Sequence, residues 1–191
     1  ESLIASFDSK SYDYFSRAFS LLESFWLLSL QPKVFIEAID ELLLSSPDQI
    51  GIFKLPSWLL DTLAALCQLK STDSVLDIYS NFGDGIVSLS QSSKDVNVFS
   101  MTNSEHSYLW EILKRSILQQ PLSNLALVKF PYGFREHLEK INHYFDTVLV
   151  AAPFNARIRI DGSRINSEQY FLQTSINWIK ERGRIVALLP E

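Results

Sequence analysis

The sequence predicts an α/β protein whose mostly parallel β-sheet is covered by helices on both faces. Short apolar runs of strand length alternate with amphipathic stretches of helix length from about residue 56 onwards. Such alternation requires crossover connections, which place helices against the faces of a parallel sheet. With 191 residues, of which 47% are hydrophobic and 20% charged, the chain is long enough to bury one sizeable core.

The first part of the chain, residues 1–47, has helical periodicity. Aromatic and apolar residues recur at three- and four-residue spacings in SYDYFSRAFSLLESFWLLSL, and KVFIEAIDELLLSS repeats the pattern after Pro32. Aromatic stripes of this kind are typical of core or interface surface rather than of a cofactor site. Pro47 and Gly51 then interrupt the helix, so we expect a helical segment over residues 1–50 and a second domain over residues 51–191.

The second part predicts an alternating series of elements that starts with a helix after Pro56. Strands are expected at SVLDIY, VNVFSMT, LALVKF, FDTVLVAAPF and RIVALLP. Helices are expected at SWLLDTLAALCQL, IVSLSQSS, SEHSYLWEILKRSILQQ and SEQYFLQTSINWIKERG, with a helical or irregular crossover at FREHLEKINHY. Gly183 is the expected C-terminal cap of the last helix. Because parallel sheets bind ligands beyond the carboxyl ends of their strands, the loops after Asp77, Met101 and Val150 are the candidate functional positions.

Composition limits the classes of partner. A net charge of -5 and a pI near 5.2 give no general basic footprint, so a DNA partner would also need other segments or subunits to hold it. The single cysteine, Cys67, lies in an apolar run and is expected to be a buried thiol. Residues 18–30 are too short and too polar to span a bilayer. We expect a cytoplasmic protein and, because the sequence starts without Met, a fragment of a longer one.

The loop after the first strand, VLDIYSNFGDG, combines an acidic residue with two glycines. Asp77 lies near the end of the strand, and Gly83 and Gly85 lie where the chain turns into a helix. Glycines at such a turn permit positive φ and close approach of a ligand to the backbone, and the helix N-terminus offers free amides. A purely turn-making role for the two glycines is an equal alternative.

From this point the sequence resembles a known family. GIFKLP, VLD…GDG, FDTVLVAAPF and SEQYFLQTSINWIKERGRIVALLPE are similar, in order and spacing, to the modification subunits of type I restriction systems, which are adenine-N6 DNA methyltransferases. The resemblance covers residues 51–191 and implies a Rossmann-like methyltransferase fold that uses S-adenosylmethionine. DNA and other restriction-modification subunits are the partners it implies, and the helical first part is similar in kind to the region that precedes the catalytic domain in that family.

The glycine motif departs from the DPxCGxG pattern of that family. Gly83 and Gly85 lie six and eight residues after Asp77, so the loop is two residues longer than in the family, and Ile78 replaces the usual proline. Asn81 and Phe82 fill the additional length. Phe82 either occludes the cofactor pocket or lies outside it.

The end of the second strand lacks the expected carboxylate. In Rossmann-like methyltransferases an acid at this place accepts both ribose hydroxyls of the cofactor. The matching residue is Thr102 or Asn103, with Glu105 two or three positions later. An alternative is that Ser104 caps the next helix and Glu105 lies in its first turn.

The end of the fourth strand departs from the (N/D)PP(F/Y) motif of adenine-N6 methyltransferases. There the Asn or Asp oxygen and the first proline carbonyl accept hydrogen bonds from the target amine, and the aromatic ring stacks on the flipped base. This chain has Ala151, Ala152, Pro153 and Phe154 in those places, and Asn155 follows too late to replace the missing acceptor. The resemblance therefore predicts a degenerate domain that is weakly active or non-catalytic. The alternatives are an active S-adenosylmethionine-dependent enzyme and a protein-interaction module that uses the aromatic helices of residues 12–44.

Two further sets of polar residues complete the candidate sites. Arg157, Arg159 and Arg164 form a local basic cluster, in a segment expected to be either a DNA-phosphate-contacting loop or a solvated one. The histidines have no Cys or His partners at metal-ligand spacing, so no metal site is expected; they are His106, His137 and His143. No loop matches the GxSxG pattern of a serine nucleophile.

Overall fold

The computed structural model describes residues 16–17, 20, 32–44, 54–93, 95–128, 144–154, 156–160 and 162–190. The chain divides into two compact units, Glu1–Ile52 and Phe53–Glu191. The assignment of residues 1–50 and 51–191 to two domains stays a prediction.

Helix α2, Pro32–Leu44, is the main described element of the first unit. Pro32 occupies its first position, where the missing N–H costs no helical hydrogen bond. Phe35 and Ile36 are buried, whereas Val34 is exposed. Most of the aromatic stripe expected over residues 12–30 lies outside the described residues. Among the helices that the structure describes, none is long and apolar enough to cross a membrane.

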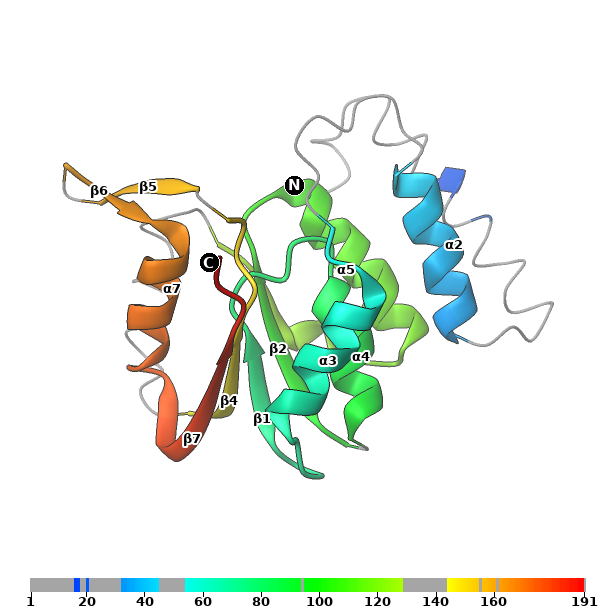
Figure 1. Ribbon diagram of the computed structural model, residues 1–191. Helices are drawn as coiled ribbons and strands as arrows, with labels where there is room; N and C mark the ends of the chain where they lie inside the picture. The colour runs from blue at the N-terminus through cyan, green and yellow to red at the C-terminus, as the bar shows by residue number, and fades with distance from the viewer. Residues whose placement is uncertain are drawn as a thin grey trace. The chain divides into compact units, whose positions relative to one another are not determined.

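Five parallel strands form the main sheet of the second unit, in the order β3-β2-β1-β4-β7 (Figure 1). Their bounds are Ser74–Asp77 (β1), Asn97–Thr102 (β2), Leu125–Leu127 (β3), Phe145–Val150 (β4) and Ile179–Ala187 (β7). Asp77 of the central strand pairs with Ser100 of β2 and Leu149 of β4. The strand order reverses between β1 and β4, which is the point where doubly wound sheets bind ligands. The predicted α/β fold with a mostly parallel sheet is confirmed.

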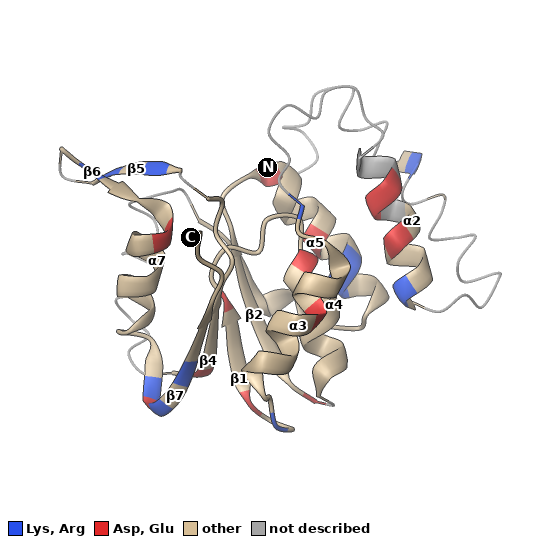
Figure 2. Ribbon diagram, in the orientation of Figure 1, with Lys and Arg blue, Asp and Glu red and all other residues tan. Residues whose placement is uncertain are grey.

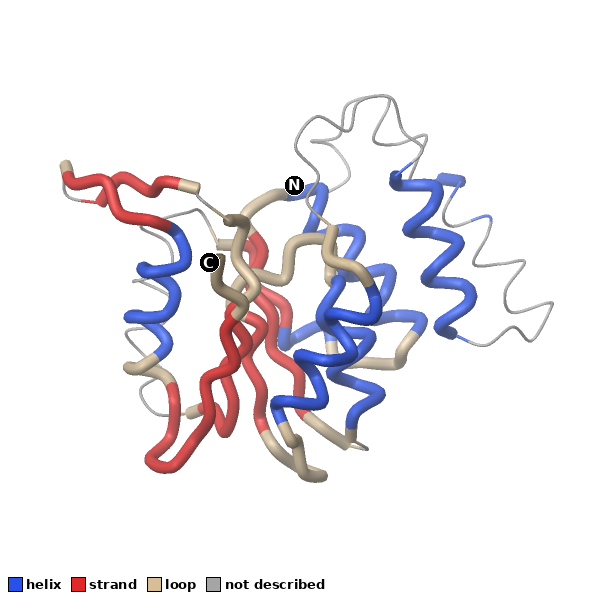
Figure 3. The backbone as a smooth tube through the Cα atoms, viewed as in Figure 1, coloured by secondary structure: helices blue, strands red, loops and turns tan. Residues whose placement is uncertain are grey.

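Helices cover both faces of this sheet (Figures 1 and 3). The helices are α3 (Ser57–Cys67), α4 (Asp84–Ser92) and α5 (Glu105–Ile117) on one face, and α7 (Ser167–Ser175) on the other; a short 3-10 helix, η2 (Leu122–Asn124), precedes β3. Cys67 is fully buried with α3 and α4 residues in one apolar cluster, as predicted. Phe171 and Trp178 are buried in the second cluster, on the α7 face.

The last helix is shorter than the sequence predicts. It ends at Ser175, and Gly183 is a residue of β7 rather than a helix cap, so that prediction was wrong. The cause is a long-range pairing: the Trp178 carbonyl accepts hydrogen bonds from the backbone N–H groups of Tyr144 and Phe145, both at 3.0 Å. Burial of the Trp178 ring and pairing with β4 draw this segment into the sheet.

The arginine-containing segment is a β-hairpin and not a loop. Strands β5 (Arg157–Ile160) and β6 (Ser163–Asn166) pair antiparallel around Gly162, which has a φ of 81°. The crossover at FREHLEKINHY, with His137 and His143, lies outside the described residues, as does Asn155.

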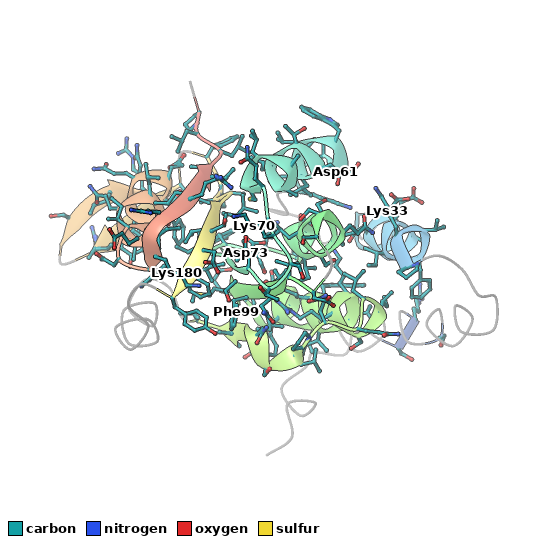
Figure 4. The ribbon with its side chains drawn as sticks, turned by 90° about the horizontal axis from the view of Figure 1, so that it is seen from below. Lys33, Asp61, Lys70, Asp73, Phe99 and Lys180 are labelled. Carbon is teal, nitrogen blue, oxygen red and sulfur yellow. The ribbon has the colours of Figure 1, made fainter. Side chains whose placement is uncertain are left out.

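Asp146 joins three strands at the end where the sheet begins. Its carboxylate accepts the backbone N–H of Ser74 at 2.8 Å and two hydrogen bonds from Lys180 Nζ, both at 2.8 Å. Figure 4, seen from this end, shows Lys180 beside the start of the sheet. Partial burial opposes ionisation of Asp146, but the hydrogen bonds from Lys180 and Ser74 outweigh it and lower its pKa.

Candidate functional site

Asp77 and two glycines form the turn from β1 into α4. Asp77 is the last residue of β1 and is 2% exposed, and Gly83 precedes α4 in the left-handed conformation, with a φ of 72°. A Cβ at Gly83 would lie 2.9 Å from Cγ of Glu111, and a Cβ at Gly85 would collide with the Asp77 carboxylate. Both positions therefore require glycine because of the chain's own side chains, whether or not a ligand binds at this turn.

Helix α5 buries three charged side chains beneath the turn. Glu111, Lys114 and Arg115 have no exposed surface. Glu111 accepts hydrogen bonds from the Ser80 hydroxyl and from Arg115 Nε, the latter at 3.0 Å. Lys114 Nζ lies 3.2 Å from Asp84 Oδ1, within hydrogen-bond and ion-pair distance. The turn is thus fixed to α5 by the buried Lys114–Asp84 ion pair and by the hydrogen bond from Ser80 to Glu111, and the Glu111–Arg115 pair within α5 holds Glu111 in place.

Arg115 also connects this network to β2. Its two terminal nitrogens donate to the Val98 and Pro121 carbonyls, both at 3.1 Å, and to Ser100 Oγ at 2.7 Å. The sequence-based search for site residues missed this network. Its only local signal was the spacing of Glu111 and Arg115, four residues apart on a helix, which usually indicates a solvated ion pair.

The environment of Asp77 opposes ionisation of its carboxyl group. Burial raises the pKa of its carboxyl well above the ordinary range, and the nearby Glu111 and Asp84 carboxylates raise it further. Its Oδ1 atom is buried and accepts no hydrogen bond from the described residues. An acid held in this way favours the protonated form or a cationic donor placed against Oδ1.

The turn also crosses to the carboxyl end of β2. The backbone N–H of Ser80 donates to the Met101 carbonyl at 2.9 Å. Thr102 Oγ1 approaches the Asn81 carbonyl and Asn103 Nδ2 approaches the Tyr79 hydroxyl, both at 3.4 Å. The chain's own loop therefore bridges the space between the ends of β1 and β2.

The candidate ribose ligands at this end do not form an acidic site. Thr102 is 2% exposed and is held by the loop, and Asn103 is exposed. Ser104 Oγ accepts the backbone N–H of Ser107 at 3.0 Å, so the prediction that Ser104 caps α5 is confirmed. Glu105 lies exposed in the first turn of that helix, where a carboxylate is favourable against the helix dipole.

The fourth strand ends in two buried alanines. Ala151 is 8% exposed and Ala152 is fully buried, and they belong to the clusters on opposite faces of the sheet. Phe154 is 37% exposed. Ser167 at the start of α7 donates from Oγ to the Pro153 carbonyl at 2.8 Å and so holds the turn against α7.

A small pocket brings together residues from both motifs. It lies at the reversal point of the sheet and is lined by Leu55, Leu60, Asp77, Tyr79, Ser80, Asn81, Asp84, Gly85, Leu149 and Ala151. Phe82 is buried but does not line the pocket, so it does not fill the space beside Asp77. The cavity volume is about 10 Å³, which is roughly the space of one water.

The pocket does not fit S-adenosylmethionine in this structure. The unpartnered Asp77 Oδ1 suits an ammonium group, but the space beside it holds about one water and the loop occupies the crevice toward β2. No carboxylate from the end of β2 lines the pocket. A metal site is likewise not formed among the residues that the structure describes, where no three His, Cys, Asp or Glu side chains are placed to hold an ion.

Comparison with known proteins identifies the fold. The sequence matches no protein-family model and no curated protein. The structure is similar to the methyltransferase subunit of a type I restriction-modification system from Streptococcus thermophilus, with a TM-score of 0.58 and 18% identity over 73% of this chain and 35% of that one. It is also similar to a protein from Vibrio vulnificus described as a modification subunit of a type I restriction enzyme, with a TM-score of 0.64 and 14% identity over 82% of this chain and 38% of that one.

A methyltransferase of a different kind has a similar structure as well. Precorrin-6y C5,15-methyltransferase from Geobacter metallireducens has a TM-score of 0.52 and 12% identity over 72% of this chain and 64% of that one. At such identities the likeness shows the fold alone: the chain has a Rossmann-like methyltransferase fold. It spans only 35% and 38% of the two restriction-system subunits.

Proposed function

We propose that this chain is a methyltransferase-fold domain of the adenine-N6 DNA type that does not transfer methyl groups efficiently and serves instead to hold DNA or a partner subunit. The observation that carries the proposal is Ala151, which lines the pocket at the end of β4 with a methyl group in the place where an amine acceptor is required. The two restriction-system subunits of similar fold support the choice of DNA as substrate class.

The chemical reason lies in the orientation of the target amine. An exocyclic amine attacks a methyl donor only when its lone pair is directed toward the methyl group, and hydrogen bonds to an Asn or Asp oxygen supply that orientation. Loss of such a group costs several kcal/mol of barrier, on the order of 100-fold or more in rate. No oxygen in the Ala151 side chain replaces it.

A closed cofactor crevice is the second reason. The Ser80–Met101 hydrogen bond and the water-sized pocket leave no room for S-adenosylmethionine unless the loop moves. Binding would then have to repay the broken contacts, so we expect a dissociation constant weaker than about 100 μM, equivalent to roughly 5.5 kcal/mol. Calorimetric titration of S-adenosylmethionine into the full chain measures it, and tighter binding would contradict this part of the proposal.

A repair experiment separates the two reasons. The double substitution Ala151→Asn with Ala152→Pro restores the acceptor motif but leaves the loop unchanged. We expect no transfer of labelled methyl groups to adenine in DNA from either protein. Transfer by the double variant alone would show that the acceptor was the only lost component, and transfer by the original chain would overturn the proposal.

The runner-up function is an active S-adenosylmethionine-dependent adenine-N6 methyltransferase. The observation that favours it is the buried, unpartnered Asp77 Oδ1 in the pocket, since a bound ammonium group would satisfy that oxygen. This function requires displacement of the residue 79–81 loop, and S-adenosylmethionine binding tighter than about 100 μM in the same titration would favour it.

A further inference from the structure

The β5–β6 hairpin presents arginines on one face only. In its register Ile158 pairs with Ile165, Arg159 pairs with Arg164, and Arg157 pairs with Asn166. Because side chains alternate between the faces of a strand, the three arginines share one face and the isoleucines share the other. All three arginines are exposed.

The opposite face of the hairpin fixes it to the protein. Ile158 is 6% exposed and belongs to the apolar cluster on the α7 face, and Ile160 and Ile165 pack against that cluster. The backbone N–H of Ser167, just after β6, donates to the Ala156 carbonyl at 2.8 Å. The arginines are therefore held on an anchored surface, at the end of the main sheet where β4 stops (Figures 1 and 2).

The arrangement of charge on this surface is unfavourable for the isolated domain. Arg159 and Arg164 lie directly opposite each other, and like charges in that position destabilise a hairpin. None of the three arginines has an ion pair or side-chain hydrogen bond within the described part of the chain. The buried Lys114 and Arg115, in contrast, are each paired with a carboxylate. Three uncompensated guanidinium groups on an otherwise acidic chain indicate an anionic partner.

The geometry favours a chain of phosphates over a single anion. Arg157 and Arg159 are two residues apart on one strand, a separation of roughly 6.6 Å, and Arg164 adds a third cation across the hairpin. Guanidinium groups bind phosphate oxygens in bidentate fashion, and a nucleic-acid strand presents phosphates in a regular row. We infer that Arg157, Arg159 and Arg164 bind the phosphodiester backbone of a nucleic acid at the end of the main sheet. The choice of nucleic acid rests on the proposed function, whereas the anionic character of the partner rests on the hairpin alone.

Salt dependence of binding provides the test. The full chain is titrated into a fluorescein-labelled DNA duplex and the corresponding single strand, and anisotropy is followed from about 50 to about 200 mM salt. Three neutralised phosphates predict a slope of log K against log salt of about -2.7 from the hairpin, or a roughly 40-fold loss of affinity over this range. The triple variant Arg157→Gln, Arg159→Gln, Arg164→Gln is expected to lose this contribution.

A matched control is available on the main sheet. Arg182 is exposed in β7, near the opposite end of the strands, and Arg182→Gln removes one charge without touching the hairpin. We expect this variant to bind as the original chain does. Equal binding by the triple variant, equal loss on Arg182→Gln, or no binding of either DNA form by the original chain would overturn the inference. Arginine-dependent binding of a phosphopeptide or an anionic vesicle in place of DNA would overturn it too.

Folding and function are checked separately. Because the triple variant removes the Arg159–Arg164 repulsion, we expect its melting temperature to be unchanged or higher. A lower melting temperature would attribute its loss of DNA binding to misfolding. In that case the single variant Arg157→Gln, which lies outside the opposed pair, tests the inference. It is expected to reduce the salt slope by about 0.9, and an unchanged slope contradicts the inference. If the original chain binds DNA without methyl transfer, the proposed function stands whatever the arginine variants show. If the original chain transfers methyl groups and its triple variant still binds DNA, both the proposed function and the inference about the hairpin are wrong.

Discussion

Arg115 Nε donates to Glu111 Oε1 at 3.0 Å, and neither side chain has any surface exposed to solvent. A buried ion pair of this kind is costly to break because the remaining partner keeps an uncompensated charge. We expect Arg115→Met or Glu111→Leu to lower the free energy of unfolding by about 3–5 kcal/mol, measured by urea denaturation.

The double variant and a surface control make this prediction specific. Arg115→Met combined with Glu111→Leu removes both charges and should cost less than either single change. Ser116→Ala, at an exposed position on the same helix, should stay within about 0.5 kcal/mol. Additive losses in the double variant would show that the two side chains do not act as a pair.

Gly83 and Gly162 allow backbone strain to be separated from crowding. Both have positive φ, but a Cβ at Gly83 would lie 2.9 Å from Glu111 Cγ, whereas nothing lies within 4 Å of one at Gly162. Gly162→Ala should cost about 1 kcal/mol from its conformation alone. Gly83→Ala should cost about 1–3 kcal/mol more because Glu111 must shift. Equal losses by thermal denaturation would mean that Glu111 moves freely.

Stability should depend on pH through Asp77. Because its pKa is raised in the folded state, the folded protein binds a proton more readily at this group than the unfolded chain does. The contribution of this proton binding to the stability of the fold is therefore lost as the pH rises from the pKa of Asp in the unfolded chain, about 3.9, toward the raised pKa of Asp77 in the folded protein. Asp77→Asn should be more stable than the original chain at pH 7, with a difference that shrinks toward pH 4.

The control for charge is Asp95→Asn, which removes an exposed carboxylate at a turn. It should change the melting temperature little at either pH. If Asp77→Asn is less stable than the original chain at pH 7, the hydrogen bond from the Tyr79 backbone outweighs burial of the charge.

Ser167 is expected to stabilise the turn that follows β4. Its hydroxyl donates to the Pro153 carbonyl and its backbone N–H donates to the Ala156 carbonyl, both at 2.8 Å. Ser167→Ala keeps the backbone hydrogen bond but removes the hydroxyl, which also lies 3.1 Å from Glu168 Oε2, and leaves the partly buried Pro153 carbonyl without that donor. The expected cost is about 1–2 kcal/mol. Hydrogen exchange of residues 153–160 should accelerate in the variant, while exchange in β1 stays unchanged; uniform acceleration would contradict a local role.

Local pattern was sufficient to predict the layered fold and the residues at the strand ends. The apolar runs placed Asp77 at the end of β1 and Ala151 just after β4, because strand length and turn signals are encoded nearby in the sequence. The hairpin also had a local signal that was passed over. Alternating Arg and Ile residues around an Asp-Gly pair are a strong hairpin pattern.

Other features depend on residues that are distant in the sequence. The segment after Ser175 has helical periodicity. Hydrogen bonds from the backbone at the start of β4 to the Trp178 carbonyl nevertheless place this segment beside the sheet, and it continues as β7. In the sequence, Lys114 and Arg115 have the pattern of surface charges, and only the structure shows that they are buried against Asp84 and Glu111. Pairing across such separations is decided by tertiary packing and not by the local sequence.

The hydrogen bond between the Ser80 N–H and the Met101 carbonyl bears on how the stability of the domain depends on ligands. A fold completed by a small molecule is stabilised by mass action, by about 2.7 kcal/mol when the free ligand is at a hundredfold excess over its dissociation constant. In this chain the hydrogen bonds that close the crevice come from residues 79–81 and are intramolecular. They form without a ligand, so under the proposed function the stability of this part of the fold does not depend on the concentration of a cofactor.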